Sequence, residues 1–243
     1  MNLDRYTRQL NVSEFGIQEQ ETLLKKHVVV IGAGGLGSNI SDILVRMGLG
    51  IIDIVDSDNV ELSNIHRTAI FSEEDVGKPK AKILEQKLKK INSEIKISGF
   101  QKRINNKNIE QIIKNADIVL DGTDNFETRC LINEACIKLD IPWVYAGVYD
   151  TTGMVMGIIS QKTPCLRCIS NAIPEKSDSV TPVFGNLPVS IASIECTEAI
   201  KLLLDKPLSG LIIYDIWKQQ FDTIDIKKNP NCNICNCKEF EFL

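Results

Sequence analysis

A glycine-rich segment between two apolar runs constrains the fold of this chain more than any other feature. Four apolar residues, Val28–Ile31, lead directly into glycines with the spacing G-x-G-x-x-G. A second apolar run, Ile51–Val55, ends at Asp56, about 20 residues further on, where an acid binds a ribose hydroxyl in dinucleotide-binding folds. The candidate phosphate-binding glycines are Gly32, Gly34, Gly35 and Gly37. The pattern predicts a strand–turn–helix–strand unit that binds a nucleotide; a turn that binds nothing is the alternative.

Polar and basic residues after the second apolar run indicate a ligand with more negative charge than a dinucleotide. Asp58 follows the predicted strand closely, and Asn64 and Arg67 are three positions apart, so on a helical turn they would share a face. Lys80 could close the other side of the same site. Two cations would neutralise a triphosphate or a departing pyrophosphate. The alternative interpretation is a solvated basic surface.

A third apolar run ends in a cluster of polar residues that includes a candidate magnesium ligand. Ile118–Leu120 has the composition of a buried strand, and Asp124 follows four residues after it. Ligands of open parallel sheets bind outside the carboxyl ends of the strands, so Asp124 is expected near the phosphates. A carboxylate in that position favours Mg²⁺. The alternative is an N-cap for the helix that begins near Asn125, a task that Asp121 or Asn125 could also perform.

Eight cysteines include two C-x-x-C pairs that are far apart in the sequence. The pairs are Cys165 with Cys168 and Cys232 with Cys235, and four such thiolates suit tetrahedral Zn²⁺. Cys237 follows closely enough to compete with Cys235 as a ligand. Disulfides are disfavoured, because the N-terminus does not have the pattern of a signal peptide and cytosolic thiols stay reduced.

Composition limits the remaining classes of function. The chain has 243 residues, of which 43% are hydrophobic and 25% charged, as expected for a globular protein with one sizeable core. The net charge of −4 disfavours a broad nucleic-acid surface, and no apolar run reaches the length of a membrane span. We therefore expect a cytoplasmic protein that partners neither nucleic acid nor membrane.

Alternating helices and strands predict an α/β fold. We expect a Rossmann-like, mostly parallel sheet with helices on both faces, an antiparallel C-terminal extension and a structural zinc knuckle. The expected strands are 27–31, 51–55, 95–101, 117–121, 142–148, 152–159, 211–215 and 221–226. The expected helices are 4–24, 37–47, 62–66, 78–91, 105–114, 125–138 and 188–205. A single domain over 1–243 would then comprise a nucleotide-binding core over 1–150 and, over 151–243, a crossover loop, the antiparallel strands and a zinc-binding tail.

Together these residues resemble the MoeB/ThiF/HesA family, the bacterial and archaeal relatives of ubiquitin-activating enzymes. The resemblance covers nearly the whole chain and keeps its motifs in order. The matching segments are Arg5–Gln9, Gly32–Ser38, Asp56–Asp58, Leu62–Arg67, Gly77–Ala81 and Gly122–Asn125.

The resemblance implies an enzyme that uses Mg-ATP to adenylate the C-terminal glycine of a small ubiquitin-like sulfur-carrier protein. The carrier would end in Gly-Gly and serve a molybdopterin, thiamine or tRNA-thiolation pathway. By the same resemblance, Asp56 would hold the ribose and Asp124 would position Mg²⁺ and the reacting centre. The phosphates would contact Asn64, Arg67 and Lys80. Arg8 would reach into the active site of the other subunit of a homodimer, and the two cysteine pairs would form a structural zinc site.

The segment after the first cysteine pair limits the expected chemistry. Residues 170–187 are expected to form a crossover loop over the tail of the carrier, and residues 171–186 contain no cysteine. Cys196, on an apolar helix, is interpreted as a buried thiol. Some members of the family use a cysteine in this segment to form a thioester or persulfide with the carrier. This departure from the family's pattern argues for adenylation without that step, with sulfur supplied by a separate sulfurtransferase.

Three rival interpretations remain open. The first is an NAD- or FAD-dependent oxidoreductase, which would leave Arg67, Lys80 and Asp124 unexplained. The second is a tRNA-carboxylate-activating dehydratase of the same superfamily, whose members lack the zinc knuckles. The third is a carrier-binding module without catalytic activity.

Overall fold

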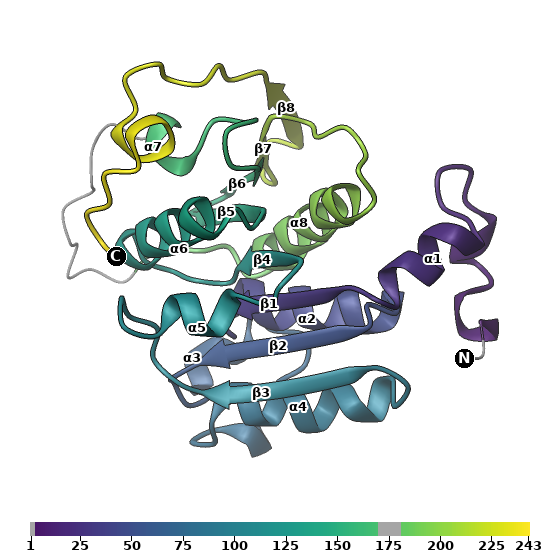
Figure 1. Cartoon of the computed structure of the whole chain (residues 1–243). Coiled ribbons are helices and arrows are strands. Elements are labelled where there is room, and N and C mark those ends of the chain that lie inside the picture. Colours follow the sequence, from purple (N-terminus) through teal and green to yellow (C-terminus); the bar gives the residue numbers. More distant parts are fainter. Residues whose placement is uncertain (1–2, 170–180) are drawn as a thin grey trace.

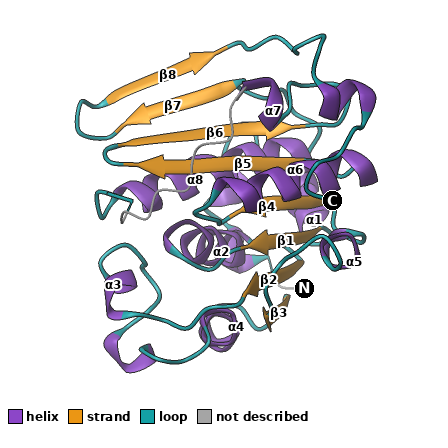
Figure 2. Cartoon of the chain, turned by 90° about the vertical axis from the view of Figure 1, so that its left-hand side faces the viewer, coloured by secondary structure: helices purple, strands orange, loops and turns teal. Residues whose placement is uncertain are grey.

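A single mixed sheet organises the molecule. The computed structural model describes residues 3–169 and 181–243, and in them the strands form an eight-stranded sheet in the order β3-β2-β1-β4-β5-β6-β7-β8 (Figures 1 and 2). The first five strands pair in parallel and the last three add to the sheet antiparallel. The strands are β1 (His27–Ile31), β2 (Ile51–Asp56), β3 (Lys96–Gln101), β4 (Ile118–Asp121), β5 (Trp143–Tyr149), β6 (Thr152–Ile158), β7 (Leu211–Asp215) and β8 (Gln220–Ile224).

Helices cover both faces of the sheet, as the sequence predicts. The α-helices are α1 (Ile17–Leu23), α2 (Gly35–Met47), α3 (Leu62–Ile65), α4 (Lys80–Ile91), α5 (Ile109–Ile113), α6 (Phe126–Leu139), α7 (Leu166–Ile169) and α8 (Leu187–Leu203). Short 3-10 turns are η1 (Asp4–Tyr6), η2 (Gln9–Asn11) and η3 (Glu73–Asp75), and η4 (Asn233–Cys237) is a π-helical turn. One apolar cluster joins α2, α4 and α8 to one face of the sheet, and a second joins α5 and α6 to the other.

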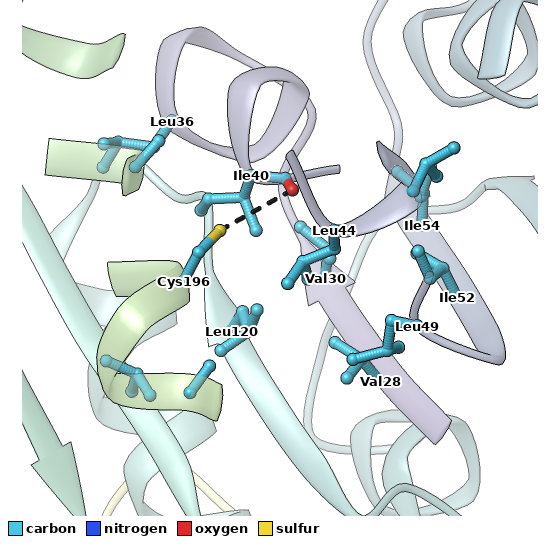
Figure 3. Close-up of a cluster of buried hydrophobic side chains, with 14 of the residues drawn as sticks. Val28, Val30, Leu36, Ile40, Leu44, Leu49, Ile52, Ile54, Leu120 and Cys196 are labelled. Atoms are coloured by element: carbon cyan, nitrogen blue, oxygen red, sulfur yellow. Dashed lines mark hydrogen bonds between the residues drawn. The ribbon is translucent and has the colours of Figure 1, made fainter. Parts of the chain in front are cut away.

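The first of these clusters fixes the position of the glycine-rich segment. Val28 and Val30 of β1 point into it, where they meet Ile40 and Leu44 of α2 (Figure 3). Cys196 of α8 is 1% exposed and its Sγ lies 3.8 Å from Ile40 O, so the sequence interpretation of a buried thiol is confirmed. A continuous run of buried aliphatic residues is typical of a parallel strand covered on both faces.

The N-terminal region differs from the expected helix over 4–24, and that prediction is wrong. Only Ile17–Leu23 is α-helical; before it the chain forms two 3-10 turns and a bridge between Val12 and Phe15. The cause is tertiary. Tyr6 is 2% exposed and fills the space beside Gly48, where any Cβ would collide with the ring, and its hydroxyl accepts a hydrogen bond from Asn92 Nδ2 at 2.9 Å.

Each of the other expected helices also differs from the observed one, by one to four residues at one end or both. Helix α2 begins at Gly35 rather than at residue 37. The expected helix 105–114 is reduced to Ile109–Ile113, because the side chains of Asn105 and Asn108 accept hydrogen bonds from nearby backbone N–H groups before it. Such local bonds compete with the helical pattern.

The C-terminal part of the chain folds back over α6. We call residues 159–169 and 225–243 the cysteine lobe; its two segments lie side by side in Figure 1, with α7 beside the C-terminal segment. Glu134 of α6 is fully buried, and its Oε2 accepts hydrogen bonds from the backbone N–H groups of Glu241, Phe242 and Leu243 at 2.7–3.2 Å. Across the described residues no helix combines the length and the apolar character that a membrane span requires.

Candidate functional site

Glycine is structurally required at two positions of the turn after β1. Gly32 has a φ of 93°, and a Cβ there would overlap the carbonyl oxygen of Gly122 in the loop after β4. A Cβ on Gly37 would overlap Gly32 O. Around Gly34, by contrast, a Cβ would have no neighbour within 4 Å. The turn is therefore packed tightly on the protein side and open on the other, as a phosphate-binding turn requires.

Arg67 lies directly over this turn. A Cβ on Gly35 would be 3.2 Å from Arg67 Cδ, so the aliphatic part of the arginine covers the start of α2. Its Nη1 donates to Ser63 O and lies 3.1 Å from His66 Nε2. The structure thus brings Arg67 to the predicted site.

Asn39 fixes the backbone at Arg67, and the sequence analysis missed it. This residue of α2 is 3% exposed. Its Nδ2 donates to Gly35 O at 2.6 Å and to Arg67 O at 3.1 Å, and its Oδ1 accepts from Ala69 N at 3.1 Å. The available signal was a carboxamide side chain among the small and apolar residues that begin α2.

Asp56 closes the turn from the end of β2. Its Oδ2 accepts from Ala33 N at 2.6 Å and its Oδ1 from Asp58 N at 2.7 Å. Burial raises the pKa of Asp56 above its ordinary value, although these amides and the charge of Lys80 oppose the shift. The carboxylate therefore has a structural task at the mouth of the turn.

Lys80 and Asn64 flank the same end of the sheet. Lys80 is the first residue of α4; its side chain is 11% exposed, and its Nζ lies 3.4 Å from Asp58 Oδ2. Asn64 is 5% exposed, and its Oδ1 caps α3 by accepting from Glu61 N at 3.0 Å. The backbone oxygen of Asn64 accepts a hydrogen bond from Arg67 N, so Asn64 and Arg67 lie on one short turn.

Asp124 is exposed in the loop after β4. Strands β1 and β4 are neighbours, and Ile31 is opposite Asp121 in their register, so this loop follows at the same end of the sheet as the glycine turn. The helix cap of α6 is Asn125, whose Oδ1 accepts from Thr128 N at 2.9 Å. The N-cap alternative for Asp124 is therefore wrong, and its carboxylate faces solvent.

Arg8 lies far from the glycine turn of its own chain. Its neighbour Gln9 donates from Nε2 to Met47 O at 3.2 Å, at the last residue of α2, whereas the turn lies at the first. Thirteen residues of helix span about 20 Å. The N-terminal segment and α3 accordingly lie on opposite sides of the molecule in Figure 1.

Four cysteine thiols meet in the cysteine lobe. Their Sγ atoms all lie within 4.8 Å of one another. Three of these Sγ–Sγ distances are 3.8 Å for Cys165–Cys168, 3.6 Å for Cys165–Cys232 and 3.5 Å for Cys168–Cys235. A tetrahedral site with Zn–S bonds of about 2.3 Å places its sulfur atoms about 3.8 Å apart, so this donor set fits zinc.

The fourth thiol of this cluster is that of Cys235. Cys237 is exposed and does not belong to the group of four, so the alternative in which it replaces Cys235 is not what the structure shows. Leu166 N donates to Asn133 Oδ1 at 3.0 Å, which ties the first cysteine pair to α6.

Most of the predicted crossover loop, residues 170–180, lies outside the described residues. The described part returns to the carboxyl end of the sheet. Asp150 N donates to Pro182 O at 2.7 Å, and Phe184 N donates to Asp150 O at 2.9 Å. A Cβ on Gly35 would lie 3.3 Å from Pro188 Cβ, so the start of α8 borders the glycine turn.

Fold and site together define an α/β protein of the Rossmann type, with an open glycine turn at the carboxyl ends of the parallel strands and a separate cluster of four thiols. The chain belongs to the ThiF family, whose model matches residues 6–234. The resemblance inferred from the sequence is confirmed.

Characterised relatives agree in sequence and in structure. A sulfur carrier protein adenylyltransferase of Thermus thermophilus is 36% identical over 247 residues, covering 96% of this chain and 90% of the relative. The SAMP-activating enzyme E1 of Haloferax volcanii is 36% identical over 240 residues, covering 96% and 88%. A crystal structure of E. coli MccB with ATP superimposes with a TM-score of 0.85 at 26% identity, covering 96% of this chain and 75% of that one.

Proposed function

We propose that this protein is an ATP-dependent adenylyltransferase that activates the C-terminal carboxylate of a small ubiquitin-like sulfur-carrier protein. The observation that carries the proposal is the meeting of three features at one end of the sheet. These are the open side of the glycine turn, the Arg67 side chain over Gly35 and the exposed Asp124 in the neighbouring loop. Relatives named as adenylyltransferases of sulfur carriers, and a similar structure with ATP, support it.

The geometry suits the joining of two anions. A carboxylate is already ionised near pH 7, so the reaction needs no general base. One of its oxygens attacks the α-phosphorus of ATP, the bond from that phosphorus to the bridging oxygen breaks, and pyrophosphate leaves. Arg67 and Lys80 would hold the phosphates and stabilise the departing charge, with Asn64 beside them. Asp56 and Asp58 would lie towards the ribose.

Asp124 is the residue that would hold Mg²⁺. It offers an exposed carboxylate, and carboxylate oxygens are preferred ligands of that ion. The bound cation would supply charge neutralisation at the phosphates.

Arg8 would act in a partner subunit. Because α2 separates it from the glycine turn of its own chain by about 20 Å, any contact between Arg8 and a nucleotide requires another copy of the chain. We therefore propose a homodimer with composite sites. Mixing Arg8→Ala with Arg67→Ala protein should restore part of the activity, because some heterodimers contain one intact site; no recovery would contradict this arrangement.

The four clustered thiols would bind a structural zinc ion. The ion would cross-link Cys165 and Cys168 to Cys232 and Cys235 across 67 residues of sequence. Because residues 171–186 contain no cysteine, we propose that the protein adenylates the carrier and leaves sulfur transfer to a separate sulfurtransferase. We propose further that the whole chain acts as one adenylation unit and, since it consumes ATP, works in the cytoplasm.

The direct test is ATP–pyrophosphate exchange with purified small proteins that end in Gly-Gly. Candidates would be captured from an extract on the immobilised protein, and the acyl-adenylate of each would be sought by mass spectrometry. Exchange should require the carrier and disappear when its last glycine is removed. Exchange with no carrier, or none with any captured carrier, would contradict the proposed function.

A further inference from the structure

A buried ionic cluster underlies the loop that carries Asp124. Among the described residues, the Asp124 carboxylate accepts one long hydrogen bond, from Asn125 Nδ2 at 3.4 Å. Its side chain is therefore weakly held, and its position depends on the backbone of residues 121–125. That backbone is in turn fixed from below by Asp121, Arg129 and Glu195.

Asp121 and Arg129 lock the turn before Asp124. Asp121 is fully buried and accepts from Thr123 N at 2.9 Å and from Thr123 Oγ1 at 2.6 Å. Arg129, on the first turn of α6, donates from Nε to Asp121 Oδ2 at 3.0 Å and from Nη2 to Thr123 O at 2.7 Å. Its guanidinium carbon lies 5.6 Å from the centre of the Tyr145 ring. One forked side chain thus ties the loop to the helix that follows Asp124.

Glu195 enters where strands β4 and β5 separate. The two strands pair at Val119–Trp143 and Leu120–Val144. Val119 N still donates to the next strand, at Pro142 O, and the next donor on that side is Asp121 N. Asp121 N also donates to Glu195 Oε1 at 2.9 Å. A carboxyl group from α8 therefore contacts the last residue of β4, next to the Asp124 loop.

The charges of this cluster balance if Glu195 is neutral. Burial raises the pKa of Glu195 well above its ordinary range, and the Asp121 carboxylate raises it further. Burial also raises the pKa of Asp121, but Arg129 and Thr123 oppose that shift. These shifts favour a proton on Glu195 over one on Asp121, which forms an ion pair with Arg129. Glu195 Oε2 is buried without a hydrogen-bond partner in the described structure.

We propose that Arg129 and Glu195 are positioning residues, which hold the 121–125 loop so that Asp124 meets the magnesium ion and phosphates of bound ATP. The proposal rests on the function proposed above. Neither side chain touches the open side of the glycine turn, so their effect should fall on the reaction rate and on the contribution of Mg²⁺ to ATP binding. Affinity for ATP without Mg²⁺ should remain, because the turn and Asp56 are untouched.

Arg129→Lys is the first test, since lysine keeps the charge beside Asp121 but cannot bridge to Thr123 O as well. We expect kcat for ATP–pyrophosphate exchange to fall about tenfold or more, with a smaller rise in KM for Mg-ATP. The matched control is Arg103→Lys, at an exposed arginine outside the cluster, which should match wild type. An unchanged kcat in a folded Arg129→Lys protein would overturn the proposal.

Glu195→Gln and Thr123→Val extend the test if Arg129→Lys fails to fold. Glutamine keeps a neutral acceptor for Asp121 N, so Glu195→Gln should retain near-wild-type kcat. A large loss of kcat in Glu195→Gln would contradict the inference that Glu195 acts as an uncharged acceptor. Thr123→Val removes one hydrogen bond of the turn at a half-buried position, and we expect kcat to fall about threefold with a smaller rise in KM for Mg-ATP. No change in kcat there would count against the proposal.

A binding measurement separates this proposal from the proposed function. Calorimetry with a non-hydrolysable ATP analogue, with and without Mg²⁺, gives the gain in affinity due to the metal without any carrier. Arg129→Lys, or Thr123→Val in its place, should reduce that gain and spare the metal-free affinity. If wild type shows the gain and the variant keeps all of it, the positioning role is wrong. If the variant loses it but no carrier supports exchange, only the proposed function is wrong.

Discussion

The carboxyl end of the sheet and the cysteine lobe differ in how they use polar groups. At the carboxyl end, Gly34 borders open space and Asp124 is exposed. In the cysteine lobe, four thiols gather within 4.8 Å and Glu134 binds three consecutive backbone amides. The first region keeps polar groups available to a ligand, and the second uses them to close the protein on itself. Damage to the first should therefore reduce activity, and damage to the second should reduce stability.

The largest expected effect is on activity, at Lys80. Lys80→Met keeps most of the buried aliphatic stem and removes the charge, so adenylation should fall by about 10²–10³-fold, the usual cost of losing one group that stabilises developing charge. ATP–pyrophosphate exchange measures this, and the melting temperature should change little. Lys82→Met, on the exposed side of the same helix, is the control. A variant as active as wild type would remove Lys80 from the site.

Metal removal should produce the largest effect on stability. Chelation, or Cys232→Ser, should lower the melting temperature and release one zinc ion per chain, measured by elemental analysis, because the ion ties distant parts of the chain together. Residual exchange activity at low temperature should persist. Cys237→Ser, at the exposed cysteine, should leave the zinc content unchanged. Zinc loss in Cys237→Ser would show that the ligand set is different.

A glycine pair tests the carboxyl end as a structural element. Gly37→Ala places a methyl group against Gly32 O and should cost about 1–3 kcal/mol of unfolding free energy. Gly34→Ala meets open space and should stay within about 0.5 kcal/mol of wild type in urea unfolding. Its methyl group would instead occupy the space expected for phosphate, so ATP binding should weaken. Equal losses of stability in Gly37→Ala and Gly34→Ala would contradict the observation that Gly34 borders open space.

A loss of stability no larger than that of Gly37→Ala is expected at Glu134. Glu134→Leu removes the acceptor of the amides of residues 241–243 and should cost about 1–3 kcal/mol, less whatever hydration those half-exposed amides regain. Hydrogen exchange of these amides should accelerate, while ATP–pyrophosphate exchange stays near wild type. The stability of Glu134→Gln, which keeps one acceptor oxygen, should lie between those of wild type and Glu134→Leu. A drop in activity without a loss of stability would show that the cysteine lobe also serves the reaction.

Local patterns in the sequence predicted much of the fold and of the site. Apolar runs predicted the strands of the sheet, and the spacing of the cysteines predicted the cluster of four thiols. The glycine spacing predicted the turn, in which Gly32 has a positive φ. Arg67 and Asp124 lie at the predicted end of the sheet, because neighbouring parallel strands have their carboxyl ends at the same edge. Their roles in catalysis, and that of Arg8, stay predictions.

The errors and omissions share a different cause. The expected helix 4–24 breaks because Tyr6 packs beside Gly48, and Asn39 matters because it joins Gly35 to Arg67. The sequence does not show the partners in these contacts, because they lie far apart along the chain.

The sequence by itself determined which residues could bind phosphate and zinc, because turn geometry and ligand spacing are local properties of the chain. Only the tertiary structure decided which side chains hold these residues in place and which residues of the same chain can reach them. Glu195 meets the end of β4 across 74 residues, and Arg8 is placed a helix length away from its own glycine turn. Such contacts depend on the packing of distant segments, whose register is set by the folded core as a whole.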